Sequence, residues 1–331
     1  MKSDRRCLPQ AYHDNLMVMQ RWLAKLEQST AVHAPPTSDD AQVLGGLFSK
    51  LWAAAGMDAS LGLVRSTPDH RLFRAVLGDY FMQSPLVRRC FDKPRGYAGD
   101  HLMMEAVCNE PPPAMTALGQ WLTLWFHDYF PPFVSVRNRR DAMAAILVAE
   151  HSRGARRVLN VACGAAPELA RTYPSVQFDE VALLDQDPEA LQYAKSSLAD
   201  AGAAPVSQIR TICSPIQALV RSAEPAGLGE FDVIYSMGLY DYLDEKRGQA
   251  LTGALWKATA PGGLFVVGNF QGHHWARYLV EAVMDWFLIY RDEDDMVTLA
   301  ADADGARIDV TTDQNGILHL LQLRKGSQRS E

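Results

Sequence analysis

The sequence of 331 residues predicts an α/β protein in which a mostly helical domain, residues 1–150, precedes a domain with a largely parallel β-sheet, residues 151–331. Two observations support this division. Apolar residues recur at helical spacing in the first part, whereas short apolar runs alternate with helical patterns after residue 156. The length, which exceeds that of one typical domain, agrees with two.

The first 150 residues carry helical patterns interrupted by polar and proline-rich segments. Apolar side chains follow a helical period at Leu16, Met19, Leu23 and Leu26. The polar segment 30–42 contains prolines and predicts a loop. Residues 43–64 are apolar with interrupting glycines, and the helical pattern returns at 70–90 and 114–128. We therefore expect a helical domain with few strands.

Five short apolar runs predict the strands of the second domain. They are residues 156–162, 180–185, 207–213, 231–237 and 263–270. Their alternation with helical patterns is typical of βαβ units, which place the strands parallel. Two later strands, 306–313 and 317–325, are separated by only three residues. Because so short a turn permits only antiparallel pairing, we expect a hairpin to close the sheet.

The composition excludes several classes of partner. A net charge of −7 and an isoelectric point near 5.7 argue against nucleic-acid binding, which needs clustered Lys and Arg. No run approaches the roughly 18 apolar residues of a membrane span, and the N-terminus does not look like a secretory signal. Five scattered cysteines without CxxC spacing predict reduced thiols, a cytoplasmic location and no metal site.

The turn after the first expected strand contains one glycine, Gly164. A nicotinamide dinucleotide normally requires three glycines there, so the turn suits a nucleoside without phosphate better. Asp185 ends the second strand about 20 residues later, the spacing of an acid that binds ribose hydroxyls. Asp187 precedes Pro188 and is expected to cap the next helix.

Polar residues also follow the third and fourth strands. Ser214 either contacts an adenine ring or caps a helix, and the sequence leaves both roles open. Tyr240, Asp241 and Tyr242 come after the fourth strand, whose carboxyl end should face a ligand crevice. We expect catalytic roles for Tyr240 and Asp241. The alternative is that the tyrosines pack in the core and Asp241 caps a helix.

The glycine turn, the acid at the strand tip and segment 260–270 together resemble the class I S-adenosylmethionine-dependent methyltransferases. The resemblance covers residues 156–324 and implies a Rossmann-like sheet with S-adenosylmethionine as cofactor. It implies cofactor-binding roles for Asn160, Ala162, Gly164, Asp185, Gln186, Ser214, Ser236 and Met237.

The sequence departs from this family in the glycine turn. Ala162 and Ala166 replace common glycines, and Asn160 stands where the family usually has an acid. Asn160 can accept a hydrogen bond but offers no negative charge to the ammonium group of the cofactor. Glu168 could supply that charge if the turn brings it inward.

A narrower resemblance extends over the whole chain. Four segments resemble the bacterial 3-hydroxypalmitic acid methyl ester synthases: residues 92–107, 135–140, 235–243 and 279–296. That family methylates the carboxylate of a 3-hydroxy fatty acid, which implies a small-molecule acceptor here. Three alternatives remain: a methyltransferase for a compact amine, thiol or hydroxyl metabolite, a non-catalytic regulatory protein that binds S-adenosylmethionine, and a nicotinamide oxidoreductase.

Segment 96–100, GYAGD, has two glycines, an aromatic residue and an acid, and we expect it to cover the acceptor. Tyr97 and Asp100 would then be catalytic, whereas on the alternative interpretation Asp100 only caps a helix. We expect substrate contacts from Arg95, Tyr97, Arg139, Tyr242, Trp286 and Tyr290. The alternatives are solvated arginines and core aromatics. His127 is a further candidate base, and a homodimer is compatible with the sequence.

Overall fold

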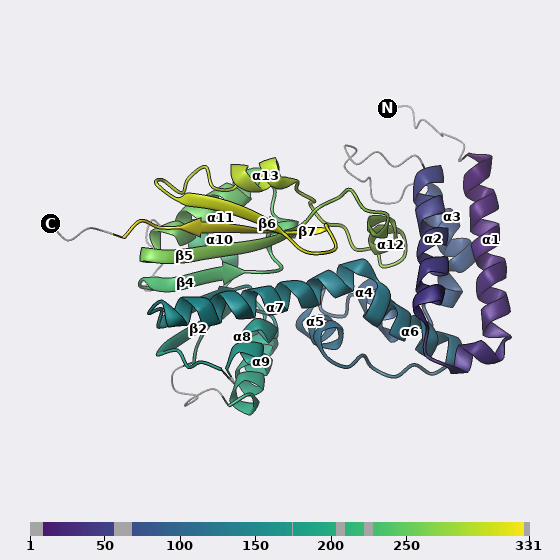
Figure 1. Ribbon diagram of the computed structural model, residues 1–331, viewed down its shortest axis with the longest axis horizontal. Helices are drawn as coiled ribbons and strands as arrows, with labels where there is room; N and C mark the ends of the chain where they lie inside the picture. The colour runs from purple at the N-terminus through teal and green to yellow at the C-terminus, as the bar shows by residue number, and fades with distance from the viewer. Residues whose placement is uncertain (1–8, 56–67, 174, 203–208, 222–227, 328–331) are drawn as a thin grey trace. The chain divides into compact units, whose positions relative to one another are not determined.

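The computed structural model describes residues 9–55, 68–173, 175–202, 209–221 and 228–327 (Figure 1). The chain divides into two compact units. The helical unit combines Met1–Val134 with His273–Phe287, and the sheet unit combines Ser135–Gly272 with Leu288–Glu331. The expected boundary after residue 150 therefore differs from the observed one, and the helical unit includes a segment from the second half of the sequence.

The boundary lies before residue 150 because most of helix α7, Pro131–Ser152, packs with the sheet unit. Ser135 Oγ and Asn138 Nδ2 both donate to Asp313, at 2.5 and 3.2 Å. The other carboxylate oxygen of Asp313 accepts the backbone N–H groups of Ile317 and Leu318. One aspartate thus closes the turn of the C-terminal hairpin and attaches it to α7.

The helical unit contains the predicted helices, with two differences. Its described elements are α1 Gln10–Glu27, η1 Thr30–His33, α2 Ser38–Ala54, α3 Pro68–Phe81, α4 Pro85–Asp92, α5 His101–Cys108, α6 Ala117–Tyr129 and α12 Ala276–Ala282. The expectation of a loop throughout 30–42 was wrong, because η1 lies there and a Thr37–Asp40 capping box starts α2. The pattern at 70–90 forms two helices, since Pro85 starts a new one. Residues 56–64 of the expected apolar stretch lie outside the described residues.

Aromatic side chains form much of the core of the helical unit. Phe48 on α2 contacts Phe73 on α3 and Trp125 on α6, and it stacks on Trp275 with ring centroids 6.1 Å apart. Tyr278 on α12 bonds through its hydroxyl to that of Tyr12 on α1, at 2.5 Å. Segment His273–Phe287 is therefore an integral part of this core.

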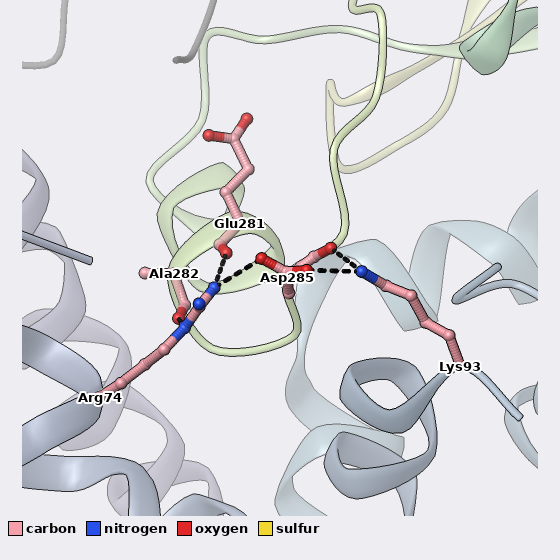
Figure 2. Close-up of polar contacts among 5 residues, drawn as sticks. All are labelled: Arg74, Lys93, Glu281, Ala282 and Asp285. Carbon is pink, nitrogen blue, oxygen red and sulfur yellow. Dashed lines mark hydrogen bonds and ion pairs between the residues drawn. The ribbon is translucent and has the colours of Figure 1, made fainter. Parts of the chain in front are cut away.

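An ion-pair network fixes the end of the same segment (Figure 2). Asp285 accepts Arg74 Nη2 at 2.8 Å and Lys93 Nζ at 2.6 Å on its two carboxylate oxygens. Arg74 also donates to the carbonyls of Glu281 and Ala282 at the end of α12, which a helix leaves without partners. Asp285 has a left-handed backbone, φ 51°, so the network holds a strained residue in place.

The sheet unit contains a single seven-stranded sheet. Its strands are β1 Arg157–Val161, β2 Glu180–Asp185, β3 Ile209–Cys213, β4 Phe231–Ser236, β5 Thr259–Phe270, β6 Arg307–Thr312 and β7 Leu318–Arg324. They lie in the order β3-β2-β1-β4-β5-β7-β6. Strands β1 to β5 are parallel, whereas β7 is antiparallel to both β5 and β6. This confirms the predicted five parallel strands and closing hairpin.

Both faces of this sheet bury apolar side chains, and two polar side chains also lie on one of them. One face packs into an apolar cluster with α10 Ile216–Arg221, α11 Glu245–Lys257 and α13 Glu293–Thr298. Leu159, Ile234 and Val267 point into that cluster. Because side chains alternate along a strand, Asn160 and Tyr235 point to the opposite face. Among the described residues, no helix is long and apolar enough to cross a membrane.

Candidate active site

The turn that follows β1 has an unusual backbone. Ala162, Gly164 and Ala166 all have left-handed conformations, with φ of 53°, 51° and 50°. Only glycine adopts this conformation without a Cβ clash, so each alanine stores about 1 kcal/mol of strain. The two alanines stand at the positions where the sequence suggested missing glycines. The turn therefore keeps a glycine-type shape without the glycines.

Asp185 at the end of β2 holds this turn. Its two carboxylate oxygens accept the backbone N–H groups of Gly164 and Asp187, each at 2.9 Å. Each oxygen keeps a further lone pair, so the side chain can still accept ribose hydroxyls. Asp187 accepts the backbone N–H of Glu189 and starts α9, Pro188–Asp200. Its predicted capping role is confirmed.

Three buried polar atoms of the sheet unit have no hydrogen-bond partner among the residues that the structure describes. Asn160 and Tyr235 are register partners on β1 and β4 and are 2 % and 0 % exposed. The Asn160 Nδ2, the Tyr235 hydroxyl and Arg139 Nε are buried without a partner. A buried unpaired donor costs about 1–3 kcal/mol, so each of these three groups is a candidate for contact with a ligand.

Arg139, on α7, lies close to Gly238 and to Gly268 on β5. Side-chain atoms on Gly238 or Gly268 would meet it, because a Cβ at Gly268 would lie 3.1 Å from Arg139 Cδ and one at Gly238 would lie 3.8 Å from Nη2. The arginine is only 6 % exposed. Within the described residues it forms no ion pair, although its charge acts to lower the pKa of Glu168 and of Asp241.

Glu168 lies in α8, Pro167–Thr172, directly after the turn. Its side chain is 5 % exposed, so the turn does bring it inward. Burial raises the pKa of Glu168, although its own backbone N–H and the charges of Arg139 and Arg140 act in the opposite direction. Burial, with a contribution from the Glu168 charge, also raises the pKa of Tyr235. Burial is therefore the main cause of the raised pKa of both side chains.

Asp241 follows β4 in the short helix η3, Tyr240–Tyr242. One carboxylate oxygen accepts the Phe270 N–H at 2.8 Å. Burial raises the pKa of Asp241 to about 6, against the Phe270 N–H and the charges of Arg139 and Arg291. Asp241 does not cap the next helix, because Asp244 starts α11 by accepting the Arg247 N–H.

The other predicted residues after β4 have structural contacts. Tyr240 is buried in the apolar cluster, and its hydroxyl lies 3.0 Å from Thr252 Oγ1. Ser236 donates to the Val161 carbonyl at 2.8 Å, and Met237 is buried. Tyr242 is partly exposed. Of the remaining predictions in the sheet unit, Gln186 is exposed and Ser214 and Tyr290 are half-buried.

Sequence reasoning missed Arg291. This buried arginine donates to Asn269 Oδ1 at 2.6 Å and to the carbonyls of Tyr240 and Leu243 at 2.7 and 2.5 Å. It thereby joins η3 to the end of β5 and fixes Asp241 in place. The one signal in the sequence was its position in segment 279–296, which resembles a known family. Its neighbours in the sequence do not indicate that its side chain binds carbonyls far away in the chain.

The remaining predicted site residues lie in the helical unit: Arg95, Tyr97, Asp100 and Trp286. Asp100 is fully buried, caps α5 through the Met103 N–H at 2.9 Å and pairs with Arg89 at 3.0 and 2.8 Å. Both His127 nitrogens have partners, Asp128 and the Asn109 carbonyl. Roles of these residues toward an acceptor stay predictions.

The sheet unit resembles a known protein family in sequence. Residues 158–263 match the family described as a methyltransferase domain. S-adenosylmethionine is the cofactor that goes with such a domain on this strand order. A search of curated proteins gives no match to this chain.

Solved structures share the fold of this chain. A Bordetella parapertussis protein, described as a possible exported protein, is 19 % identical, matches over 99 % of both chains and has a TM-score of 0.62. Magnesium protoporphyrin IX methyltransferase from Synechocystis with bound S-adenosylhomocysteine is 12 % identical over 72 % of this chain and 98 % of its own, with a TM-score of 0.50. At such identities the likeness concerns fold alone. The cytoplasmic location stays a prediction.

Proposed function

We propose that this protein is an enzyme that transfers a methyl group from S-adenosylmethionine to a carboxylate of a small molecule. The match of residues 158–263 to a methyltransferase domain carries the proposal, together with the strand-end site built around Gly164 and Asp185. The left-handed turn allows a nucleoside to approach the backbone closely, and Asp185 accepts its ribose hydroxyls.

The residues present fit the cofactor. The sulfonium supplies an electrophilic methyl group, and the protein positions the acceptor and excludes water. Asn160 and Tyr235 offer unpaired polar groups in a buried region beside the turn. Of the other predicted contacts, Ser214 donates its backbone N–H to the Asp185 carbonyl, which fixes the end of β3 beside the ribose acid.

The unpaired Arg139 supports a carboxylate acceptor. A guanidinium with an unused donor and little exposure can hold a carboxylate by charge-assisted hydrogen bonds. Transfer from a sulfonium to a carboxylate forms a C–O bond as the C–S bond breaks, and both charges disappear. No base is required, because the carboxylate is already ionised. The narrower sequence resemblance favours a 3-hydroxy fatty acid, with Arg95, Tyr97 and Trp286 as candidate contacts.

Asp241 supports a second candidate, a compact amine, thiol or hydroxyl acceptor. Such an acceptor must lose a proton, and a buried carboxylate with a pKa of about 6 is ionised at neutral pH and can take it. The variant Asp241→Asn separates the two. It should leave methyl ester formation within about threefold of normal but lower turnover of a hydroxyl or amine by roughly 100-fold or more.

Calorimetry with S-adenosylhomocysteine and with NAD tests the proposal. We expect micromolar binding of the first and none of the second, and Asp185→Ala should weaken binding by roughly 1.5–3 kcal/mol. Incubation with 3-hydroxy fatty acids and S-adenosylmethionine should then give methyl esters by mass spectrometry. Tight binding of NAD alone would contradict the proposal. Binding of S-adenosylhomocysteine without methylation of any acceptor in a cell extract would favour a regulatory protein.

A further inference from the structure

Strand β6 lies at an edge of the sheet. It is the last strand in the order β3-β2-β1-β4-β5-β7-β6, and β7 is its one strand neighbour in the part of the chain that the structure describes. All of its residues except Val310 are exposed. The strand contains no proline, and its two charged residues have opposite signs, so the usual protections of a sheet edge are missing. The edge of β6 is therefore open to pairing with another strand.

The register of the hairpin shows which backbone groups of β6 face outward. At the turn, Asp313 donates its backbone N–H to the Leu318 carbonyl at 2.9 Å, so these two residues form a hydrogen-bonded pair. Hydrogen-bonded and non-hydrogen-bonded pairs alternate along antiparallel strands. The odd-numbered residues of β6 therefore bond to β7. Ile308, Val310 and Thr312 direct their N–H and C=O groups away from the sheet.

The side chains of β6 offer apolar surface on one face and charge on the other. Val310 packs against the apolar cluster of the sheet, so Ile308 lies on the same face, while Arg307 and Asp309 lie on the opposite one. Ile308 is 41 % exposed, and Val297 on α13 is 43 % exposed. Among the described residues, neither Arg307 nor Asp309 forms an ion pair or a side-chain hydrogen bond. Both charges are free to bind a partner.

We propose that two copies of this chain form a dimer through antiparallel pairing of their β6 strands, with the two-fold axis at Ile308. This pairing places Arg307 opposite Asp309 of the partner subunit, and the symmetry repeats that contact. Ile308 lies opposite its own copy, and the two residues exchange their outward N–H and C=O groups. The two sheets become one continuous sheet. The pairing does not depend on the proposed function.

A register centred on Val310 has the correct hydrogen-bonding parity too but fits less well. It would place Arg307 opposite Asp313, whose carboxylate already accepts side-chain donors from α7 and backbone donors from the hairpin turn. It would also place the apolar Ile308 opposite the polar Thr312. Directly opposite side chains determine the stability of a strand pair, so the register centred on Ile308 is favoured.

Sedimentation velocity of the full chain between about 1 and 100 µM tests the pairing. A short strand gives a small interface, so we expect monomer and dimer in an equilibrium that shifts with concentration. Arg307→Asp and Asp309→Arg each place like charges opposite each other and should weaken the dimer at least about tenfold. The double variant restores opposite charges and should recover the dissociation constant to within about threefold. Arg21→Asp, at an exposed position on α1, is the matched control and should change nothing.

Ile308→Pro tests the backbone part of the interface. The Ile308 N–H faces away from β7, so proline there removes no hydrogen bond within the sheet, and edge strands tolerate it. We expect a monomer whose melting temperature in dilute solution is nearly unchanged. A wild-type protein that stays monomeric up to about 100 µM would overturn the inference. A dimer that none of these variants weakens would overturn it as well, and so would weakening by both single charge variants without recovery in the double variant.

Discussion

The helical unit pairs its buried acid Asp100 with an arginine, whereas the sheet unit contains both a paired buried acid, Glu150 with Arg324, and two buried charges that form no ion pair within the described residues. In the helical unit, Asp100 pairs with Arg89 and Asp285 with Arg74 and Lys93. In the sheet unit, Glu168 and Arg139 are more deeply buried than those cations, yet they form no ion pair within the described residues. Paired charges stabilise a fold, whereas unpaired ones weaken it until a ligand binds. The unpaired charges of the sheet unit are therefore the ones that we propose to contact a ligand.

The largest effect should come from Asp100→Ala in the helical unit. The change removes a fully buried acid, its bidentate ion pair with Arg89 and a helix cap. We expect the free energy of unfolding to fall by about 3 kcal/mol, measured by chemical denaturation. Asp100→Asn keeps the cap and should lose less. If Asp100 instead acts on the acceptor, Asp100→Asn would lower turnover without changing stability. Asp100 would then not be a charge whose role is to stabilise the helical unit.

Arg139→Met tests an unpaired buried charge in the sheet unit. We expect kcat/KM to fall by roughly 10- to 100-fold, the loss of about 1.5–3 kcal/mol of charge-assisted binding, with stability unchanged or higher. Its neighbour Arg140, which pairs with Asp141, gives the control Arg140→Met. A destabilised Arg139→Met protein with normal kcat/KM would show that Arg139 is structural.

Asp285→Asn should have a smaller effect, because Asp285 and its partners are partly exposed. We expect a loss of about 1 kcal/mol that shrinks in high salt. Burial raises the pKa of Asp285, but the hydrogen bonds and charges of Lys93 and Arg74 outweigh it and lower the pKa below the ordinary 3.8. The stabilisation is therefore complete above pH 3.8 and is lost as the pH falls through the lower, folded-state pKa. Asp79→Asn, at an exposed position on α3, is the control.

The smallest effects concern the strained turn. Ala162→Gly and Ala166→Gly should each stabilise the protein by about 0.5 kcal/mol, because relief of the left-handed strain exceeds the entropy that glycine adds to the unfolded chain. Ala165→Gly lacks the positive φ and should be neutral or destabilising. The melting temperatures of the three variants, measured by thermal denaturation, test this expectation. Equal shifts in all three would show that the strain does not contribute.

The sheet could be predicted from the sequence because its signals are local. Apolar runs, a three-residue turn and the Asp187–Pro188 pair each act within a few residues. The inclusion of His273–Phe287 in the helical unit could not be predicted, since it depends on contacts such as Arg74–Asp285 across more than 200 positions. The absence of an ion pair for Arg139 within the described residues could not be predicted either. A sequence shows an arginine but not the distance to the nearest acid.

The position of His273–Phe287 also sets an order of events during synthesis. The first 134 residues leave the ribosome without Trp275, Tyr278 and Asp285, which complete their core and their ion-pair network. The N-terminal helices can therefore contact α12 only after β5 and then α12 itself have been translated. Domains often fold in the order of translation, N-terminal part first. In this chain the last contacts of the first unit form only when most of the sheet unit has already been made.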